Sequence, residues 1–181
     1  MTQLYLIRHG IAVERNPSLK DEARPLTERG TEKTQKVAQR LKEIQIKFDI
    51  ILTSPLLRAR QTATILQNAG LTDKLEEFSP LSPGGSPQLW VDWWLNSQYH
   101  HHNSSLAVVG HQPDLGNWAE IFLWGQVQGT LVVKKAGIIG LNLPLSSNPV
   151  GESELFLLTP RSFSFKKRVT RFERATFTLA R

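Results

Sequence analysis

The sequence predicts an α/β fold, a three-layer α/β/α sandwich around a mostly parallel central sheet. Short apolar runs at residues 3–7, 49–53 and 106–109 have the length and composition of buried strands. Polar residues follow each run, and a stretch with helical signals comes after them. Strands that alternate with helices form parallel sheets with helices on both faces, and such sheets bind ligands beyond the carboxyl ends of their strands.

The first helix is predicted from about residue 27 to residue 45. Thr27 is a good N-cap, and apolar residues recur at helical spacing among charged ones. Residues 13–24 precede this helix and contain mostly polar residues and chain breakers, so we expect a long exposed loop. Loops of that length tend to be functional.

The second and third strands are each followed by a predicted helix. Ser54 and Pro55 supply an N-cap and a first helical residue, for a helix that runs to about residue 68 and is closed by Gly70. Pro113 opens the next helix, which extends to about residue 124. Residues 137–143 and 154–158 are predicted as additional strands, and the sequence leaves their direction open.

A short helix over residues 88–95 carries Trp90, Trp93 and Trp94. Indoles at helical spacing favour packing in the core or at its rim over a base-stacking platform. The histidines of residues 100–102 are consecutive, and adjacent side chains do not converge on one ion, so we interpret them as a solvated loop and not as a metal site.

Composition limits the classes of protein to which the chain can belong. Its 181 residues suit one domain spanning residues 1–181, and 40% apolar with 21% charged residues argue against disorder, collagen and coiled coil. Without cysteine there is no disulfide, thiolate nucleophile or zinc–thiolate site. No apolar stretch approaches the roughly 20 residues of a bilayer span, and no cationic leader is present. We therefore expect a cytoplasmic protein without a membrane partner.

His9 is the candidate for chemistry on phosphate. A neutral imidazole accepts a phosphoryl group well when one ring nitrogen faces phosphorus and a hydrogen bond on the other fixes the tautomer. His9 follows the first strand and precedes Gly10, at a bend that could hold the ring in this way. The charge that develops on the phosphoryl oxygens needs fixed donors. Arg8 offers one beside His9, and Arg58 and His111 offer others from positions at or just past the ends of other strands.

Together these motifs resemble the histidine phosphatase superfamily, also called the phosphoglycerate mutase-like fold. The resemblance rests on Leu6-Ile7-Arg8-His9-Gly10, on Ser54-Pro55 with Arg58, and on Gly110-His111. Further segments resemble the SixA branch, the phosphohistidine phosphatases. They are residues 24–27 with Gly30, residues 54–62, the Pro83-Gly84-Gly85 turn and residues 110–113.

The resemblance implies that His9 is the transiently phosphorylated nucleophile. It implies that Arg8 and Arg58 clamp the phosphoryl oxygens and that His111 completes the pocket. Arg24 would reach the phosphate or the substrate. No metal and no organic cofactor is implied, and phosphate is the product. Arg60 is interpreted as a solvated helix residue.

The position of a general acid bears on the substrate. Superfamily members that act on alcohol phosphates generally use a carboxylic acid from the region after the second helix, where this chain has Glu76 and Glu77. A phosphohistidine releases an imidazole whose conjugate acid has a pKa of about 6.5, so it needs protonation less than an alkoxide does. The sequence therefore favours phosphohistidine on a protein, such as a histidine phosphotransfer domain.

Two alternatives remain at the level of sequence. One is a small-molecule phosphatase or mutase, which predicts Glu76 or Glu77 in the pocket. The other is a non-enzymatic module that binds a phosphoprotein through the basic segment at residues 160–181. That segment carries most of the net charge of +6, and docking to an acidic partner or a solvated terminus would both explain it. No nucleic-acid fold signature accompanies it.

Overall fold

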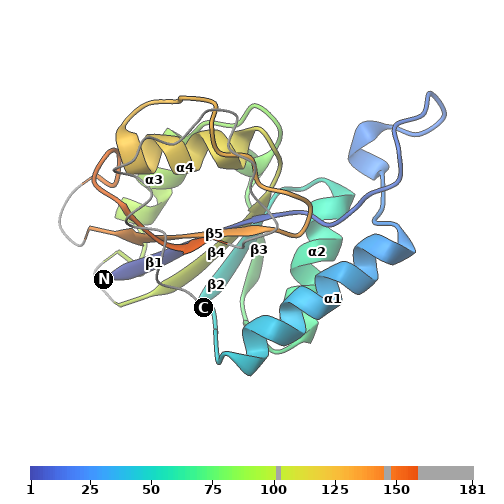
Figure 1. Ribbon diagram of the computed structural model, residues 1–181, viewed down its shortest axis with the longest axis horizontal. Coiled ribbons are helices and arrows are strands. Elements are labelled where there is room, and N and C mark those ends of the chain that lie inside the picture. Colours follow the sequence, from blue (N-terminus) through green and yellow to red (C-terminus); the bar gives the residue numbers. More distant parts are fainter. Residues whose placement is uncertain (101–102, 145–147, 159–181) are drawn as a thin grey trace, which may run out of the picture.

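The computed structural model describes residues 1–100, 103–144 and 148–158. Within them a six-stranded sheet lies between two pairs of helices, which is the α/β/α sandwich that the sequence predicts (Figure 1). The strands are β1 (Thr2–Arg8), β2 (Ile50–Thr53), β3 (Leu75–Glu77), β4 (Ser105–Gly110), β5 (Ile138–Leu143) and β6 (Glu154–Leu158). The helices are α1 (Glu28–Glu43), α2 (Leu57–Asn68), α3 (Pro87–Leu95) and α4 (Asp114–Trp124), with short 3-10 turns at Asp21–Ala23 and Ser79–Leu81. The predicted basic segment 160–181 lies outside the described residues.

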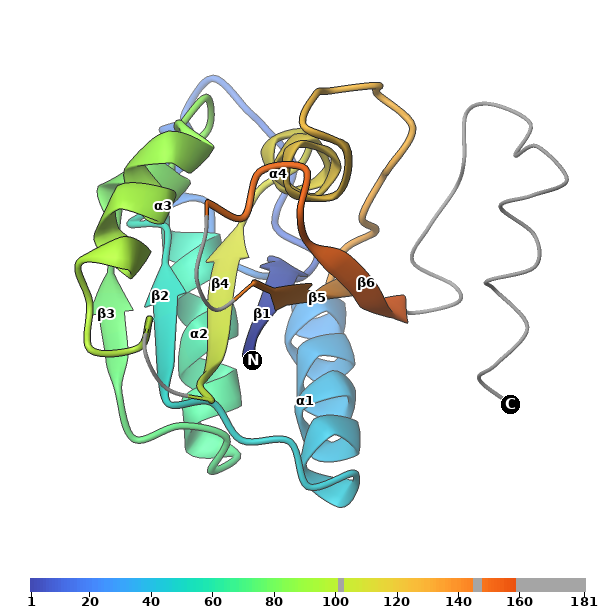
Figure 2. The same cartoon turned by 90° about the vertical axis from the view of Figure 1, so that its left-hand side faces the viewer.

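The sheet is parallel through its first four strands and antiparallel at β5. Its order is β3-β2-β4-β1-β5-β6, and Figure 2 shows this order from left to right. Strands β3, β2, β4 and β1 pair in parallel, whereas β5 runs antiparallel to β1 and β6 antiparallel to β5. The carboxyl ends of β2, β4 and β1 therefore lie side by side, next to the amino end of β5.

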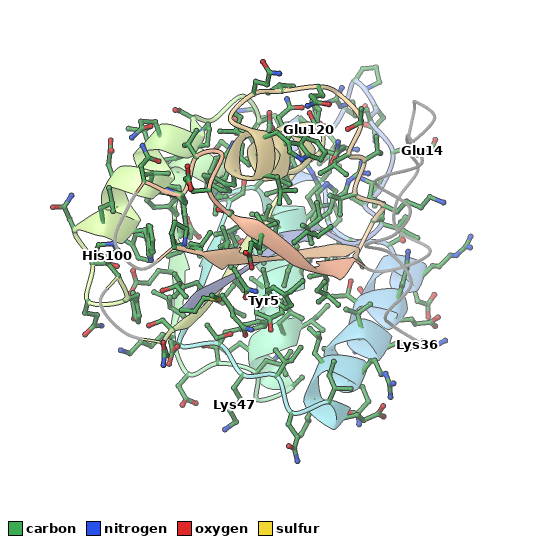
Figure 3. The ribbon with its side chains drawn as sticks, turned by 60° about the vertical axis from the view of Figure 1, so that its left-hand side comes forward. Tyr5, Glu14, Lys36, Lys47, His100 and Glu120 are labelled. Atoms are coloured by element: carbon green, nitrogen blue, oxygen red, sulfur yellow. The ribbon has the colours of Figure 1, made fainter. Side chains whose placement is uncertain are left out.

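Both faces of the four inner strands, β2, β4, β1 and β5, are largely buried, which explains why their sequences are mostly apolar. Helices α3 and α4 cover one face, and α1 and α2 cover the other (Figure 1). Side chains alternate along β1, so Leu4 and Leu6 join the core under α3 and α4 while Tyr5 and Ile7 join the core against α1 and α2. Tyr5 lies at the middle of the sheet in Figure 3.

The tryptophans of α3 belong to the core, as predicted. Trp90 and Trp94 are fully buried and stack with ring centroids 6.0 Å apart, and Trp93 is partly buried at the rim. The expectation of a solvated loop is wrong for His100, which is buried and meets Trp94 edge-on at 4.6 Å. The edge-to-face contact with the Trp94 indole stabilises the buried position of this imidazole. Residues 101 and 102 lie outside the described residues.

Two predicted helix starts are also wrong. Helix α2 begins at Leu57 and not at Pro55, because residue 54 continues the strand: the Ser54 amide donates to the Val109 carbonyl at 2.9 Å. Leu56 then occupies the N-cap position in an extended conformation. Helix α4 begins at Asp114, with Pro113 as its N-cap.

Strand β3 was not predicted from the sequence. It has three residues and pairs with β2 alone, at the edge of the sheet. Two of the three are Glu76 and Glu77, which are exposed and of a type depleted in strands, so no strand pattern was visible there. In the part of the chain that the structure describes, no helix is long and apolar enough to cross a membrane.

Candidate active site

The site is assembled where neighbouring parallel strands end. His9 follows β1 and His111 follows β4, and the register pairs Arg8 with Gly110 directly before them. The His9 amide continues this pairing by donating to the Gly110 carbonyl at 3.1 Å. The two imidazole centroids consequently lie 5.1 Å apart.

A pocket of about 440 Å³ lies at this edge of the sheet, and all five predicted site residues line it. The lining comprises Arg8, His9, Arg15, Arg24, Arg58, Pro83, Gly84, His111, Gln112, Pro113, Asp114 and Lys135. Glu76 and Glu77 are not in it, and Glu77 instead pairs with the exposed Arg60 at 3.1 Å. A second hollow, of about 470 Å³, lies along α2 and is largely apolar, with Arg60 as the ionisable group in its lining.

His9 is held in one tautomer. Its Nδ1 lies 2.7 Å from the Gly10 carbonyl oxygen, which can only accept, so the proton sits on Nδ1 and the lone pair on Nε2. Arg58 Nε and Lys135 Nζ approach that Nε2 to 3.3 and 3.2 Å. Burial, together with the charges of Lys135 and Arg58, lowers the pKa of His9 to about 2. The ring is therefore neutral at neutral pH, with its free nitrogen directed at the cations.

His111 is neutral, and Ser54 holds its ring. Its Nε2 lies 2.8 Å from Ser54 Oγ, and that oxygen also accepts the Leu56 amide at 3.3 Å. A serine hydroxyl can both donate and accept, and when it donates to Nε2 the His111 proton lies on Nδ1. This Nδ1 is buried and has no partner among the described residues. Burial, then the charges of Arg58 and Lys135, lowers the pKa of His111 to about 3.

Arg58 is fixed by the long loop that precedes α1. Its Nη1 donates to the Asp21 carbonyl at 2.6 Å and its Nη2 to the Asp21 carboxylate at 2.9 Å. Asp21 also meets Arg15 at 2.8 Å and Arg24 at 3.0 Å. Burial alone would raise the pKa of Asp21, but the guanidinium groups hold it at about 2. The length of the loop that contains Asp21 is the one sequence signal that pointed to this residue.

Backbone carbonyls position the other two predicted arginines. Arg8 Nη1 donates to the Val133 carbonyl at 2.6 Å, and Arg24 Nη1 donates to the Val13 carbonyl at 2.8 Å. Burial lowers the pKa of Arg8, which stays a cation at neutral pH because guanidinium starts far above it. Arg24 is nearly buried, with 12% of its side chain exposed.

Lys135 is the site residue that sequence reasoning missed. It lies in the loop before β5, and burial followed by the charges of Arg8 and Arg58 lowers its pKa to about 8. Because β5 is antiparallel to β1, the residues that precede it reach the carboxyl edge of the parallel strands. Had the sequence revealed the direction of β5, it would have predicted that Lys135 lies at the site.

The arrangement suits a phosphoryl group. A neutral imidazole with a free ring nitrogen shares the pocket with Arg8, Arg24, Arg58 and Lys135. Asp21, which pairs with Arg24 and Arg58, and Asp114 in the lining balance part of this positive charge. Such cations stabilise the oxygens of a transferring phosphoryl group. Among the described residues no cluster of His, Asp or Glu side chains could hold a metal ion.

Known proteins are similar to this chain in sequence and in fold. The family model of the histidine phosphatase superfamily (branch 1) matches residues 4–80. Phosphohistidine phosphatase SixA of Escherichia coli is 32% identical over 118 residues, which cover 63% of this chain and 70% of that protein. The chain belongs to the histidine phosphatase superfamily.

Within the histidine phosphatase superfamily, the relatives place the chain in the SixA-type branch, as predicted. A structure of the protein histidine phosphatase SixA with tungstate superposes with a TM-score of 0.75 at 25% identity, covering 88% of this chain and 97% of that one. A phosphoglycerate mutase from Plasmodium falciparum, 17% identical, shares the fold with a TM-score of 0.61 and covers 94% of this chain and 98% of that one. An uncharacterized protein of Picosynechococcus is 47% identical over 158 residues, or 87% of this chain and 95% of that protein.

Proposed function

We propose that the chain is a phosphohistidine phosphatase that acts on a phosphorylated protein in the cytoplasm through a phosphoenzyme at His9. The observation that carries this proposal is the state of His9. Its Nδ1 is occupied by the Gly10 carbonyl, and its Nε2 lies in the pocket within 3.3 Å of two cations. A nucleophile for phosphorus needs this combination of a fixed tautomer and a free nitrogen.

In the first step His9 Nε2 forms a bond to phosphorus. The bond from phosphorus to the substrate nitrogen breaks with its electron pair, and the substrate ring, which carries a proton on its other nitrogen, departs as neutral imidazole. Arg8, Arg58 and the Nδ1–H of His111 hold the three phosphoryl oxygens. In the second step water attacks phosphorus, the electron pair returns to His9 Nε2, and phosphate leaves. Removal of one oxygen-holding group should raise the barrier by roughly 2.7 to 4 kcal/mol, by analogy with the loss of an oxyanion-hole donor.

The choice of a phosphohistidine substrate rests on the leaving group. Glu76 and Glu77, the carboxylates expected for an alcohol phosphatase, lie outside the pocket lining. A leaving imidazole gains less from a general acid than an alkoxide does. The cations and histidines of the pocket are therefore sufficient for cleavage of a P–N bond, which does not require a carboxylic acid.

The test compares two substrates and two arginines of one helix. We expect the wild type to dephosphorylate a phosphorylated histidine phosphotransfer domain faster than p-nitrophenyl phosphate. His9→Ala should abolish both activities, and Arg58→Ala should lower them by about 10² to 10³ fold. Arg60→Ala is the matched control because Arg60 is exposed on the same helix, and it should retain wild-type rates. Equal rates on the two substrates, or turnover by His9→Ala, would contradict the proposal.

A second candidate function has a specific observation in its favour. Asp114 lines the pocket, where its carboxylate accepts the Gly84 amide at 3.1 Å, so it could protonate an alcohol leaving group. A small-molecule phosphomonoesterase of this kind predicts that Asp114→Asn slows phosphate esters sharply and leaves phosphohistidine turnover unchanged. The third possibility, a phosphoprotein-binding module without activity, fails if turnover depends on His9.

A further inference from the structure

Lys135 contacts the reacting nitrogen itself. Its Nζ lies 3.2 Å from His9 Nε2, and Arg58 Nε lies 3.3 Å from the same atom. Two donors therefore share one lone pair in the resting site. Both must leave that lone pair before it can bond to phosphorus.

The backbone around Lys135 is tied to the end of β1. Ala136 has a φ of 58°, a left-handed conformation that is strained in a residue with a side chain. Its amide lies 3.1 Å from the Arg8 carbonyl and 3.2 Å from the His9 carbonyl. The Arg8 amide in turn donates to the Gly137 carbonyl at 3.0 Å. The strained turn thus fixes Lys135 against the residues that carry the nucleophile.

A buried carboxylate anchors the preceding part of the same loop. Glu120 of α4 is fully buried, and Figure 3 labels it on that helix. Its two oxygens accept four successive amides and one hydroxyl at 2.5 to 2.9 Å, from Gln128, Gly129, Thr130 and Leu131. Gln112 then bridges the Leu131 carbonyl and the Val133 amide at 3.2 Å each. These hydrogen bonds hold the loop in a fixed position as it reaches the pocket. A lysine that was merely solvated would not need such a fixed loop.

We propose that Lys135 is a further catalytic residue, whose ammonium group moves from His9 Nε2 to a phosphoryl oxygen as the P–Nε2 bond forms. This inference rests on the proposed phosphoryl transfer to His9. In-line attack places the leaving atom on the far side of phosphorus from Nε2, whereas Lys135 lies beside Nε2. Its position therefore fits an equatorial oxygen and not the leaving group, so Lys135 keeps its proton throughout while the bond from phosphorus to the leaving atom breaks.

The proposal also explains a property of the resting site. Lys135 and Arg58 hold charge beside Nε2, which helps to keep His9 unprotonated before substrate arrives. The pKa of Lys135, lowered to about 8, leaves the ammonium mostly charged at pH 7 and mostly neutral above pH 9. Loss of that charge should weaken phosphate binding at alkaline pH.

The experiment compares Lys135→Met and Lys135→Arg with Lys134→Met. Lys134 is exposed, so it is a matched control that removes the same charge one residue away. Calorimetry with inorganic phosphate at pH 7 should show weaker binding by Lys135→Met, binding close to wild type by Lys134→Met, and an intermediate value for Lys135→Arg. Turnover of the phosphorylated domain should fall by about 10² to 10³ fold in Lys135→Met. Equal phosphate binding and turnover in Lys135→Met and Lys134→Met would overturn the proposal.

The pH profile provides a readout that a merely structural role would not move. Wild-type phosphate binding should weaken above pH 8, and in Lys135→Arg this decline should shift well above pH 10 because guanidinium stays charged. An unchanged decline in Lys135→Arg would contradict the assignment. Phosphate binding needs no phosphohistidine, so a failure of the substrate proposal would show as lost turnover with the phosphate results intact.

Discussion

At the scale of single residues, the state of protonation decides what the site can do. His9 has to be neutral with its proton on Nδ1, and the contact with the Gly10 carbonyl meets both conditions. His111 also has to be neutral, and it can donate to a phosphoryl oxygen from Nδ1 when the Ser54 hydroxyl donates to its Nε2. The sequence shows which residues are histidines, but their tautomers depend on atoms from three different strand ends.

The two histidines should not titrate near neutrality. Burial lowers the pKa of His9 to about 2 and that of His111 to about 3, so both rings stay neutral from pH 8 to pH 5. Two-dimensional NMR with labelled imidazole nitrogens should show constant chemical shifts for both rings over this range. In urea the same rings should titrate near pH 6.5. A titration of His9 between pH 6 and 7 in the folded protein would contradict the lowered pKa of this ring.

At the scale of elements, helix α1 and the segment after β1 are in direct contact. A Cβ at Gly30 would lie 2.0 Å from the Ile11 carbonyl oxygen, and one at Gly10 would lie 2.6 Å from Thr34 Oγ1. The Ile11 carbonyl also accepts the Thr27 amide at 2.9 Å. The first turn of α1 therefore presses on the backbone just beyond His9, and only glycine permits this approach.

Gly30→Ala should destabilise the protein by about 1 to 3 kcal/mol, because the new Cβ would clash with the backbone of Ile11, which cannot rotate away as a flexible side chain could. Urea denaturation would measure the change in the free energy of unfolding. Glu32→Ala, on the exposed face of the same helix, serves as the control and should shift stability by less than about 0.5 kcal/mol. Equal stability of the two variants would show that α1 can move without cost.

Glu120→Gln should also destabilise the fold, and it should weaken the site as well. A glutamine has one acceptor oxygen in place of two, so part of the amide set around Glu120 loses its partner, at a cost of about 1 to 3 kcal/mol. Because the loop continues to Lys135, phosphate binding should weaken too. Urea denaturation and calorimetry would measure these effects, with the exposed Glu152→Gln as control. Wild-type phosphate binding in Glu120→Gln would show that the loop holds its position without the carboxylate.

At the scale of the whole molecule, the buried site makes stability depend on pH. Below pH 6.5 the unfolded chain takes up protons on His9 and His111 that the folded chain does not, so the free energy of unfolding falls as the pH falls. The loss approaches about 1.4 kcal/mol per pH unit for each histidine. Asp21 works in the same direction but at lower pH, since its stabilising pairs are complete above pH 3.8 and are lost as the pH falls towards about 2.

Urea denaturation at pH 7, 6 and 5 would measure this dependence. The wild type should lose stability steadily across the series, and a His9→Gln, His111→Gln double variant should lose much less. Identical slopes for the two proteins would mean that the histidines are protonated in the folded state.

The sequence by itself determined the elements and most of the site. Apolar runs, caps and glycines are local signals, and they predicted the helices and most of the strands. The positions at strand ends, together with the family resemblance, predicted five of the residues that line the pocket. The tertiary structure alone decided the direction of β5, which brings Lys135 to His9. It also decided that Asp21 pairs with Arg58 and that the His9 proton lies on Nδ1. The physical reason is that these features depend on contacts between segments far apart in the chain. Local preference does not encode which strand edges meet or which atoms then share a proton.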